Sequence, residues 1–391
     1  MQIINPEKIK KADLVIGIPS YNEAKNIGFV TTKVAFGLKK YFSSKESVII
    51  NVDNHSSDGT KEVFFKAKAD IPRIYISTPK DIKGKGYNFY NLFLAMKKLK
   101  AKVGVVVDAD LRSIKPIWIK KLAGPIFSGF EYVLPFYFRR EDDAIITNHL
   151  VYPLIYGLLG WNVRQPIGGE FAFSSRLVDI WLTQKWTQST KKFGIDIFMT
   201  LNALFNKTKI CQVNLGIKIH KPSAPSLDPM FEQVAGTLFE ILSTSPLERR
   251  IVKIKKAPLF GKSTFSLPDI KPNYKNLENI FLTKFNIYQK LFRKYLNKEV
   301  YKKLETMYQK RKVDIDLGLW TKIVYDFLYV FSLTKKLAIV KSLKYLYFGR
   351  AASFFKRTVD FTPIQSEKEV LKQAKYFFEK RDYFFNKNKK E

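Results

Sequence analysis

Two aspartates, Asp108 and Asp110, follow residues 103–107, a run of valines with one glycine. Such a short apolar run is typical of a strand buried on both faces. Alternate residues of an extended chain point the same way, so the two carboxylates share one face at the carboxyl end of the strand. Like charges side by side repel unless a positive charge lies with them. The pair fits either a divalent cation that itself holds a phosphate, or a helix cap paired with Arg112.

The elements around this pair alternate between two patterns. Strand patterns cover residues 13–22, 47–54, 73–78 and 102–110, and helix patterns cover residues 24–42, 57–69 and 88–99. This alternation predicts an α/β fold with a mostly parallel sheet flanked by helices. In such sheets ligands bind beyond the carboxyl ends of the strands. Four polar clusters fall at or near that edge, at residues 20–23, 53–56, 83–86 and 108–110.

The last third of the chain has another character. Its aromatic residues recur at helical spacing, and Ser366 and Glu369 have the spacing of a helix-starting capping box. We therefore predict two parts, residues 1–225 with the sheet and residues 226–391 as a mostly helical extension. Residues 241–391 hold 34 Lys and Arg but only 14 Asp and Glu, within a total net charge of +33. This excess favours anionic partners, unless it reflects a lysine-rich proteome.

Two further features concern the environment of the protein. Residues 144–163 carry no Asp, Glu, Lys or Arg, but polar residues and glycines interrupt them. We read them as a buried helix with a loop, although their length alone would allow a membrane span. Cys211 is the single cysteine of the chain, which excludes an intrachain disulfide and favours a cytoplasmic location.

The ordered motifs IPSYNEAKNI, VDNHSSDGT, KGKGYN and DADL resemble the nucleotide-diphospho-sugar transferases of the GT-A fold. No Gly-x-Gly-x-x-Gly follows the first strand and no Walker loop is present, so the two common nucleotide-binding loops lack support. The later motifs RREDDAIITN, RQPIGGEF, FGIDIFMT and IKIHKP are similar to the retaining branch that contains glucosyl-3-phosphoglycerate synthase and mannosylglycerate synthase. The resemblance covers about residues 12–225 and is poor over the helical extension.

The resemblance implies a donor site in residues 1–225. Glu23 and Asp53 would contact the base and ribose, Pro19 and Tyr21 would shape the turn, and Lys83 would reach the phosphates. Asp108 would face the ribose and the metal. The sugar side would be formed by the motif RQPIGGEF and the segment after it, with Ile167, Gly168, Gly169, Glu170 and Asp196. The two glycines fit either close approach of a sugar or a simple turn. Lys83, Glu170 and Asp196 would be the catalytic groups.

The resemblance also implies a divalent metal, Mg²⁺ or Mn²⁺, held by Asp108, Asp110 and His220. Carboxylate and imidazole ligands suit these ions, which neutralise the charge of a departing diphosphate. The alternative for His220 is a strand-end histidine in a polar rim, and the metal ligand is the favoured interpretation. A small anionic acceptor would be held by residues matching the acceptor segment: Arg139, Thr147, Asn148 and Arg164. Arg139 and Arg140 fit also a solvated basic pair.

Taken together, these patterns predict a metal-dependent retaining hexosyltransferase. It would move glucose or mannose from a nucleotide-diphospho-sugar to D-glycerate or 3-phosphoglycerate. One alternative is an inverting transferase that acts on a polyprenyl phosphate at the membrane surface, and another is a basic helical protein that binds nucleic acid. We expect no nucleic-acid partner, allow for peripheral membrane contact, and expect a homo-oligomer.

Overall fold

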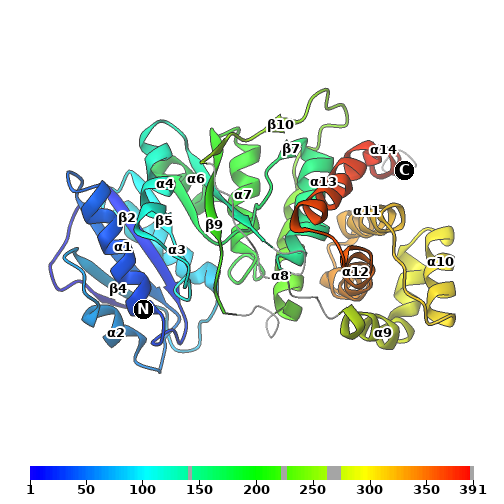
Figure 1. Ribbon diagram of the computed structural model, residues 1–391, viewed down its shortest axis with the longest axis horizontal. Helices are drawn as coiled ribbons and strands as arrows, with labels where there is room; N and C mark the ends of the chain where they lie inside the picture. Colours follow the sequence, from blue (N-terminus) through cyan, green and yellow to red (C-terminus); the bar gives the residue numbers. More distant parts are fainter. Residues whose placement is uncertain (140–142, 222–226, 262–273, 388–391) are drawn as a thin grey trace. The chain divides into compact units, whose positions relative to one another are not determined.

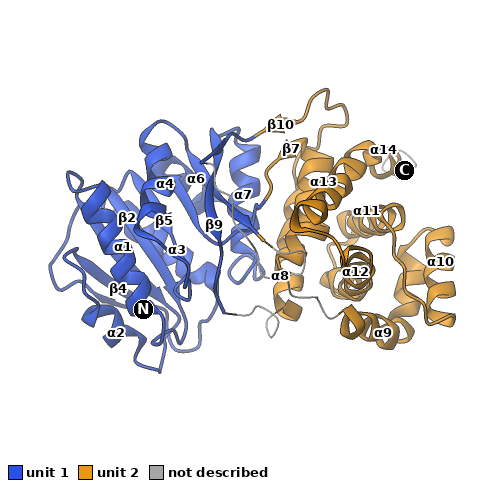
Figure 2. Cartoon of the chain, viewed as in Figure 1, with its two compact units in different colours: residues 1–138, 165–226, 257–265 blue, residues 139–164, 227–256, 266–391 orange. Residues whose placement is uncertain are grey.

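The computed structural model describes residues 1–139, 143–221, 227–261 and 274–387. The chain divides into two compact units, each assembled from separate stretches of sequence (Figure 2). Unit 1 comprises residues 1–138, 165–226 and 257–265, and unit 2 comprises residues 139–164, 227–256 and 266–391. The predicted boundary between residues 225 and 226 lies outside the described residues, and that division stays a prediction.

A mixed sheet forms the centre of unit 1 (Figure 1). Among the described residues it has nine strands, in the order β1-β4-β3-β2-β5-β8-β6-β9-β11. The bounds are β1 (Gln2–Ile4), β2 (Leu14–Ser20), β3 (Ser47–Asp53), β4 (Arg73–Ser77), β5 (Val103–Val106), β6 (Tyr132–Phe138), β8 (Phe171–Ser174), β9 (Ile210–Ile217) and β11 (Leu259–Phe260).

Most neighbouring strands of the sheet run parallel. Strands β2, β3, β4 and β5 pair in parallel, as do β6 with β9 and β9 with β11. The edge strand β1 is antiparallel to β4, and β8 runs antiparallel between β5 and β6. The predicted mostly parallel α/β architecture is therefore confirmed.

Helices cover both faces of this sheet. They are α1 (Ile27–Tyr41), α2 (Thr60–Lys66), α3 (Lys85–Lys98), α4 (Pro116–Phe127), α6 (Ser175–Thr183) and α7 (Ile195–Phe205). On one face α1 and α4 pack on a core that includes Ile16 and Ile18 of β2. On the other face Gly17 leaves room for Leu92 of α3, because a Cβ at Gly17 would lie 2.3 Å from that side chain. Alternation along β2 thus assigns its side chains to the two layers.

Unit 2 is mostly helical, as predicted for the extension. Its elements are η1 (Thr147–Val151), α5 (Tyr152–Leu154), η2 (Ile155–Leu159), β7 (Trp161–Asn162), α8 (Leu227–Thr244), β10 (Lys255–Lys256), α9 (Tyr274–Tyr295), α10 (Lys298–Gln309), α11 (Leu317–Thr334), α12 (Leu337–Thr358), α13 (Pro363–Glu379) and α14 (Arg381–Lys387). Helix α12 is buried along most of its length and packs on α8, α9 and α11. The two short strands β7 and β10 pair in parallel.

The structure of unit 2 tests two local predictions, the buried helix and the capping box at Ser366. Residues 147–159 form one continuous buried helical stretch with two π-helical segments, so the predicted buried helix is confirmed. No helix of the described ranges has the length and apolar character needed to cross a bilayer. The capping box predicted at Ser366 is wrong: α13 begins earlier, because Thr362 and Gln365 form the reciprocal cap and Pro363 occupies the first turn.

Candidate active site

The polar clusters predicted at strand ends do meet at the carboxyl edge of the sheet in unit 1. Strand β2 ends at Ser20 beside Asp53, the last residue of the parallel strand β3. The carboxylate of Asp53 is fully buried and accepts hydrogen bonds from Ser20 Oγ (2.5 Å), Tyr75 Oη (2.9 Å), and the backbone N–H and hydroxyl of Ser56 (both 2.6 Å). Asp53 therefore ties the ends of β2, β3 and β4 together, and its predicted contact with the nucleotide stays a prediction.

A cluster of buried and half-buried charges lies next to this edge. We call it the charge cluster, and it consists of Lys85, Asp108, Glu170, Asp196 and Lys218. Lys85 Nζ lies 3.1 Å from Asp108 Oδ1 and 3.3 Å from Asp196 Oδ1. Lys218 Nζ lies 3.0 Å from Asp108 Oδ2 and 2.9 Å from Glu170 Oε2. Two ammonium groups thus bridge three carboxylates.

Five different elements supply the charge cluster. Lys85 is the first residue of α3, Asp108 follows β5, and Asp196 lies in the first turn of α7. Glu170 directly precedes β8, and Lys218 directly follows β9. These elements are far apart in sequence, and the sheet order brings them to one edge, since β5, β8, β6 and β9 are consecutive neighbours. The sheet therefore positions the side chains rigidly.

Burial and mutual charge set the protonation of the cluster. Burial works to raise the pKa of Asp108, but attraction to Lys218 and Lys85 outweighs it and holds that pKa well below its usual range. Burial raises the pKa of Glu170 to about 7, against the attraction of Lys218 and with added repulsion from Asp108. Burial likewise raises the pKa of Asp196, in spite of Lys85. Glu170 therefore keeps its proton to a much higher pH than an exposed glutamate does.

Tyr137 completes the surroundings of Glu170. Its hydroxyl donates a 2.5 Å hydrogen bond to Glu170 Oε2, while Lys218 Nζ lies 3.0 Å from Oε1. Neither Glu170 nor Lys218 has more than 5% of its side chain exposed. These contacts leave Glu170 little freedom to turn, so the group is fixed before any ligand binds.

The predicted glycines form the backbone wall beside the cluster. The carbonyl of Gly168 accepts a 2.9 Å hydrogen bond from Lys218 Nζ. Gly169 has φ = 100°, and a Cβ there would lie 2.6 Å from both Asp108 Oδ2 and Lys218 Nζ. Glycine is required at position 169 both by its backbone angle and by the close approach of these charged atoms. Ile167, next to them, is half-buried.

The KGKG segment packs against another loop of unit 1. The N–H of Gly86 donates to the carbonyl of Lys192 (3.1 Å), and a Cβ at Gly86 would lie 2.1 Å from the carbonyl oxygen of Thr190. This packing lets α3 begin at Lys85, three residues earlier than predicted. Lys83, just before the helix, is exposed, and its Nζ donates to Tyr21 Oη at 2.7 Å and lies 4.6 Å from the centre of that ring.

The remaining donor-side residue, Glu23, is held close to the start of α1. Its carboxylate accepts from Asn26 Nδ2 at 2.9 Å and from Lys221 Nζ at 2.7 Å. Pro19 is buried within β2, opposite Val52 of β3. Tyr21 and Lys83 are thus exposed to solvent at the carboxyl edge of the sheet, whereas Pro19 is part of the buried sheet itself.

The segment after β9 lies along the loop that carries Asp110. The carbonyl of Ile219 accepts from the N–H of Arg112 (2.8 Å), and the N–H of Lys221 donates to Asp110 Oδ2 (3.1 Å). His220, between them in sequence, is therefore beside Asp110. Within the described ranges, no group of three or more His, Cys, Asp and Glu side chains is arranged to hold a metal ion. Asp108 is already paired with the ammonium groups of Lys85 and Lys218, and the ligand set Asp108, Asp110 and His220 stays a prediction.

The four predicted acceptor residues all belong to unit 2, and Arg139, Asn148 and Arg164 form one network there. Arg139 Nη1 lies 3.3 Å from Asp143 Oδ2, and Asn148 Nδ2 donates to the carbonyl of Asp143 at 3.3 Å. Arg164 donates to Asn148 Oδ1 at 2.9 Å and forms a fork with Glu367 of α13, at 2.6 and 2.8 Å. Thr147 is buried beside Asn148 at the start of η1.

Sequence reasoning missed Lys85 and Lys218, the two cations of the charge cluster. Both lie inside quoted motifs, KGKGYN and IKIHKP, in which the sequence predicted roles for Lys83 and His220 instead. One signal was available: three carboxylates at strand ends and a helix start need buried positive charge nearby. A lysine directly after a β-strand and another at the first position of a helix were the candidates.

One comparison with known proteins identifies a similar family for the part of the chain that carries Asp108 and Glu170. Residues 15–179 match the family model of glycosyl transferase family 2. The match spans the strand ends, Asp108 and Glu170, and it confirms the predicted resemblance to glycosyltransferases over these residues. A search of curated proteins found no match.

Several solved structures are similar to part of the chain. Glucosyl-3-phosphoglycerate synthase from Mycobacterium tuberculosis, in complex with Mn²⁺, uridine diphosphate and phosphoglyceric acid, has a TM-score of 0.48 and 25% identity, covering 59% of this chain and 78% of that chain. The same enzyme with Mg²⁺ and uridine diphosphate has a TM-score of 0.47 and 24% identity, covering 59% and 79%. A mycobacterial protein has a TM-score of 0.47 and 25% identity, covering 59% and 74%.

Proposed function

We propose that this chain is a retaining hexosyltransferase that moves glucose or mannose from a nucleotide-diphospho-sugar to D-glycerate or 3-phosphoglycerate. The observation that carries the proposal is the charge cluster at the carboxyl edge of a glycosyltransferase domain. A structural ion pair does not need three carboxylates and two lysines from five elements at the edge where α/β sheets bind ligands. Perturbed pKa values in such a place favour a functional site.

The donor would lie across the ends of β2, β3 and β5. Lys83 and Tyr21, at the solvent side of the rim, would contact the nucleotide and its phosphates. The backbone of Gly168 and Gly169 would face the sugar, where the absence of side chains permits close approach. Glu170 and Asp196 would hydrogen-bond sugar hydroxyls, and the lysines that hold them would keep their orientation fixed.

A divalent cation, Mg²⁺ or Mn²⁺, fits the loop that carries Asp110. Among the described residues only the N–H of Lys221 donates to the Asp110 carboxylate, through Oδ2, which leaves Oδ1 able to act as a ligand. His220 directly precedes Lys221, the residue that contacts Asp110, and Asp108 lies two residues before Asp110 in the sequence. When bound, the metal would neutralise charge on the departing diphosphate.

The anomeric configuration is retained when the acceptor oxygen attacks the anomeric carbon from the same face of the sugar that the diphosphate leaves. The bond between the anomeric carbon and the phosphate oxygen breaks as the acceptor oxygen bonds to that carbon. The acceptor hydroxyl proton passes to the phosphate oxygen that has left. Lys85 and Lys83 would stabilise the negative charge on this side, so most of the rate would come from positioning and electrostatics. Asp196 is a second candidate for the proton acceptor, since its pKa is raised by burial.

The acceptor would use the network in unit 2. Arg139 is the group suited to its carboxylate, because a guanidinium can clamp a carboxylate with two hydrogen bonds. Asn148 and Thr147 would contact its hydroxyl groups. Arg164 is already paired with Glu367, so a phosphate on the acceptor would have to compete with that carboxylate.

A donor and acceptor screen tests the proposal directly. Purified protein is incubated with nucleotide-diphospho-sugars, D-glycerate or 3-phosphoglycerate, and Mg²⁺ or Mn²⁺, and release of nucleoside diphosphate is measured together with the anomeric configuration of the product. We expect turnover that requires the metal and is lost in Asp110→Ala, with Asp70→Ala, an exposed aspartate paired with Lys39, as the matched control. Transfer only to a polyprenyl phosphate in vesicles, with inversion, would support the membrane-surface alternative instead.

A further inference from the structure

The outward face of α1 carries an unusual stripe of side chains. Phe29, Lys33, Phe36 and Lys40 follow one another at spacings of four, three and four, so they lie along one side of the helix. Phe29 is 45% exposed and Phe36 is 57% exposed. Large aromatic side chains in such positions cost a soluble protein solubility and often mark an interaction surface.

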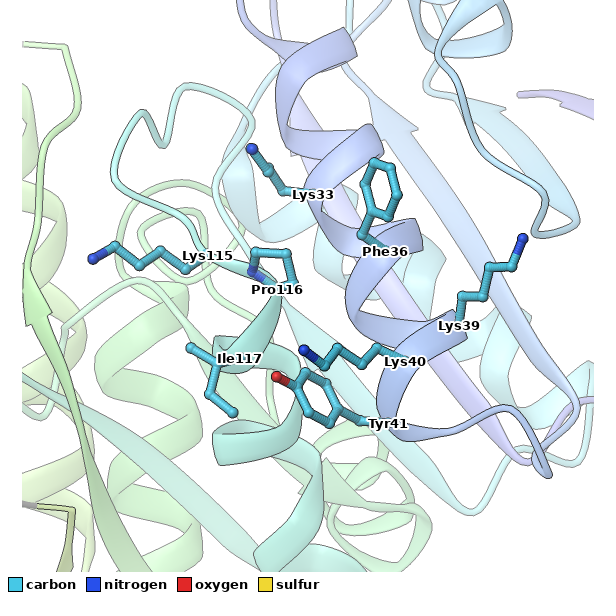
Figure 3. Close-up of a pocket in the computed structure, with 8 residues that line it drawn as sticks. All are labelled: Lys33, Phe36, Lys39, Lys40, Tyr41, Lys115, Pro116 and Ile117. Atoms are coloured by element: carbon cyan, nitrogen blue, oxygen red, sulfur yellow. The ribbon is translucent and has the colours of Figure 1, made fainter.

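Helix α4 extends this face. It crosses α1 at Gly37, where a Cβ would lie only 2.6 Å from the carbonyl oxygen of Pro116. A hollow of about 480 Å³ lies at the crossing, lined by Lys33, Phe36, Lys39, Lys40, Tyr41, Lys115, Pro116 and Ile117. Figure 3 shows Phe36 on α1 with the lysine side chains of Lys33 and Lys39 on either side of it.

A second hollow lies along the other flank of α1, toward α2. Its volume is about 380 Å³, and it shares Lys33 with the first hollow and includes Phe29. Phe36 therefore lines the first hollow and Phe29 the second, and Lys33 lines both. We call the surface formed by Phe29, Lys33, Phe36, Lys40, Tyr41, Lys115 and Lys120 the basic aromatic face.

The charges of this face have one sign. Residues 24–45, which contain α1, include five lysines and no acidic residue, and residues 111–130, which contain α4, include Arg112 and three lysines and no acidic residue. Among the described residues, Lys33, Lys40, Lys115 and Lys120 have no carboxylate within ion-pair distance, whereas Lys39 pairs with Asp70. A positive potential over the face follows from this composition.

The lysines lie next to the aromatic rings rather than apart from them. Lys33 Nζ is 5.2 Å from the centre of the Phe29 ring, and both Lys40 and Lys120 are 5.5 Å from that of Tyr41. Rings that enter the boundary of a bilayer, with lysines that reach the headgroups, combine apolar burial with attraction to anionic lipid. The face combines phenyl rings with lysines, and its hollow has no Arg, Asn or Gln to read base edges, which favours lipid over nucleic acid.

We propose that the basic aromatic face docks this protein on the surface of a bilayer that contains anionic phospholipid. Phe29 and Phe36 enter the interfacial layer, and the surrounding lysines contact the headgroup phosphates. The inference does not rest on the proposed transfer reaction, because it concerns the outer surface of α1 and α4 and uses none of the charge-cluster residues.

Co-sedimentation of the full chain with vesicles tests this docking. We compare phosphatidylcholine vesicles with vesicles that also contain phosphatidylglycerol. The wild-type chain should sediment only with the second kind, and added salt should weaken the binding. Lys40→Glu/Lys115→Glu should lower the partition coefficient by at least about fivefold for each lysine. Phe29→Ser/Phe36→Ser should lower it by roughly tenfold or more.

Matched variants on unit 2 separate this face from the general positive charge of the chain. Lys302→Glu/Lys303→Glu on α10 makes the same change of net charge, and Ile287→Ser on α9 removes a side chain that is 64% exposed. Both should bind vesicles almost as the wild type does. Equal losses in the control and test variants would overturn the proposal. So would failure to sediment with anionic vesicles, or binding of an oligonucleotide that depends on Phe36 while vesicles are ignored.

Discussion

Lys218 Nζ lies 3.0 Å and 2.9 Å from the two carboxylate oxygens of Glu170, and Glu170 has no exposed side-chain surface. The same ammonium group also reaches Asp108, so one buried cation serves two carboxylates. Buried ion pairs are costly to break, because removal of one partner leaves the other charge without compensation. The charge cluster is therefore both the centre of the proposed site and a structural element of unit 1.

Lys218→Met should strongly destabilise the protein. Loss of the ammonium leaves the buried Glu170 carboxyl and Asp108 without this partner, and the free energy of unfolding should fall by roughly 3–5 kcal/mol. Urea denaturation followed by circular dichroism measures this. Lys39→Met, which removes an exposed partner of Asp70, is the control and should change little. Similar midpoints for the two variants would show that Lys218 does not hold the cluster together.

Stability should depend on pH through Glu170. Its pKa is raised from 4.5 to about 7, mainly by burial. Between these values the folded protein keeps a proton that the unfolded chain has released, so this contribution is complete below about pH 4.5 and is lost as the pH rises through about 7. Glu170→Gln should flatten the fall of Tm with pH across that window. Glu62→Gln, an exposed glutamate, should leave the slope unchanged, and an equal slope in Glu170→Gln would contradict the assignment.

Gly169→Ala should cost more than its backbone angle explains. Gly169 and Gly129 both have positive φ, 100° and 93°, and strain from alanine should cost each roughly 1–3 kcal/mol. A Cβ at Gly169 would also meet Asp108 and Lys218 at 2.6 Å, whereas one at Gly129 would meet no atom within 4 Å. Thermal unfolding gives the loss of stability for each variant. The difference between the two losses is the cost of the close contacts at Gly169. We also expect kcat to fall only in Gly169→Ala.

Arg139→Ala should weaken binding of the acceptor and not of the donor. The Arg139 side chain is 12% exposed, and loss of a partly enclosed ionic contact should cost roughly 2–5 kcal/mol of acceptor binding. The acceptor KM should thus rise by more than about tenfold, since each 1.4 kcal/mol is a factor of ten. Steady-state kinetics with each substrate varied in turn would show it. Arg176→Ala, an exposed arginine paired with Glu131, is the control, and an unchanged acceptor KM in Arg139→Ala would refute the assignment.

Local patterns predicted the strands and helices of residues 13–110 well, but strand β1 (Gln2–Ile4) was not predicted. Strand β5 and its aspartates, for example, follow from a short β-branched run and the two-residue period of an extended chain. The antiparallel insertion of β8 between β5 and β6 could not be predicted in this way. It depends on pairing between strands that are about 70 residues apart, which no local period records.

The candidate site was predictable only in part, for a related reason. Asp108, Glu170 and Asp196 could be named one by one, yet their protonation depends on Lys85 and Lys218, which reach them across long stretches of sequence. The early start of α3 at Lys85 depends on contacts with residues 190–192. Partners of this kind are set by the tertiary fold, so the chemistry of the cluster appears only when the elements are assembled.

The short strand β11 has a practical consequence for fragments of this protein. Leu259 and Phe260 pair with Gln212 and Val213 of β9, and the carbonyl of Pro258 accepts a 2.7 Å hydrogen bond from the N–H of Gln212. A truncated gene that stops after β9 would therefore leave that strand as an unprotected edge, ready to pair with another chain. An expression fragment that rejoins residues 257–261 to the glycosyltransferase domain should resist such aggregation better than one cut to a single contiguous segment.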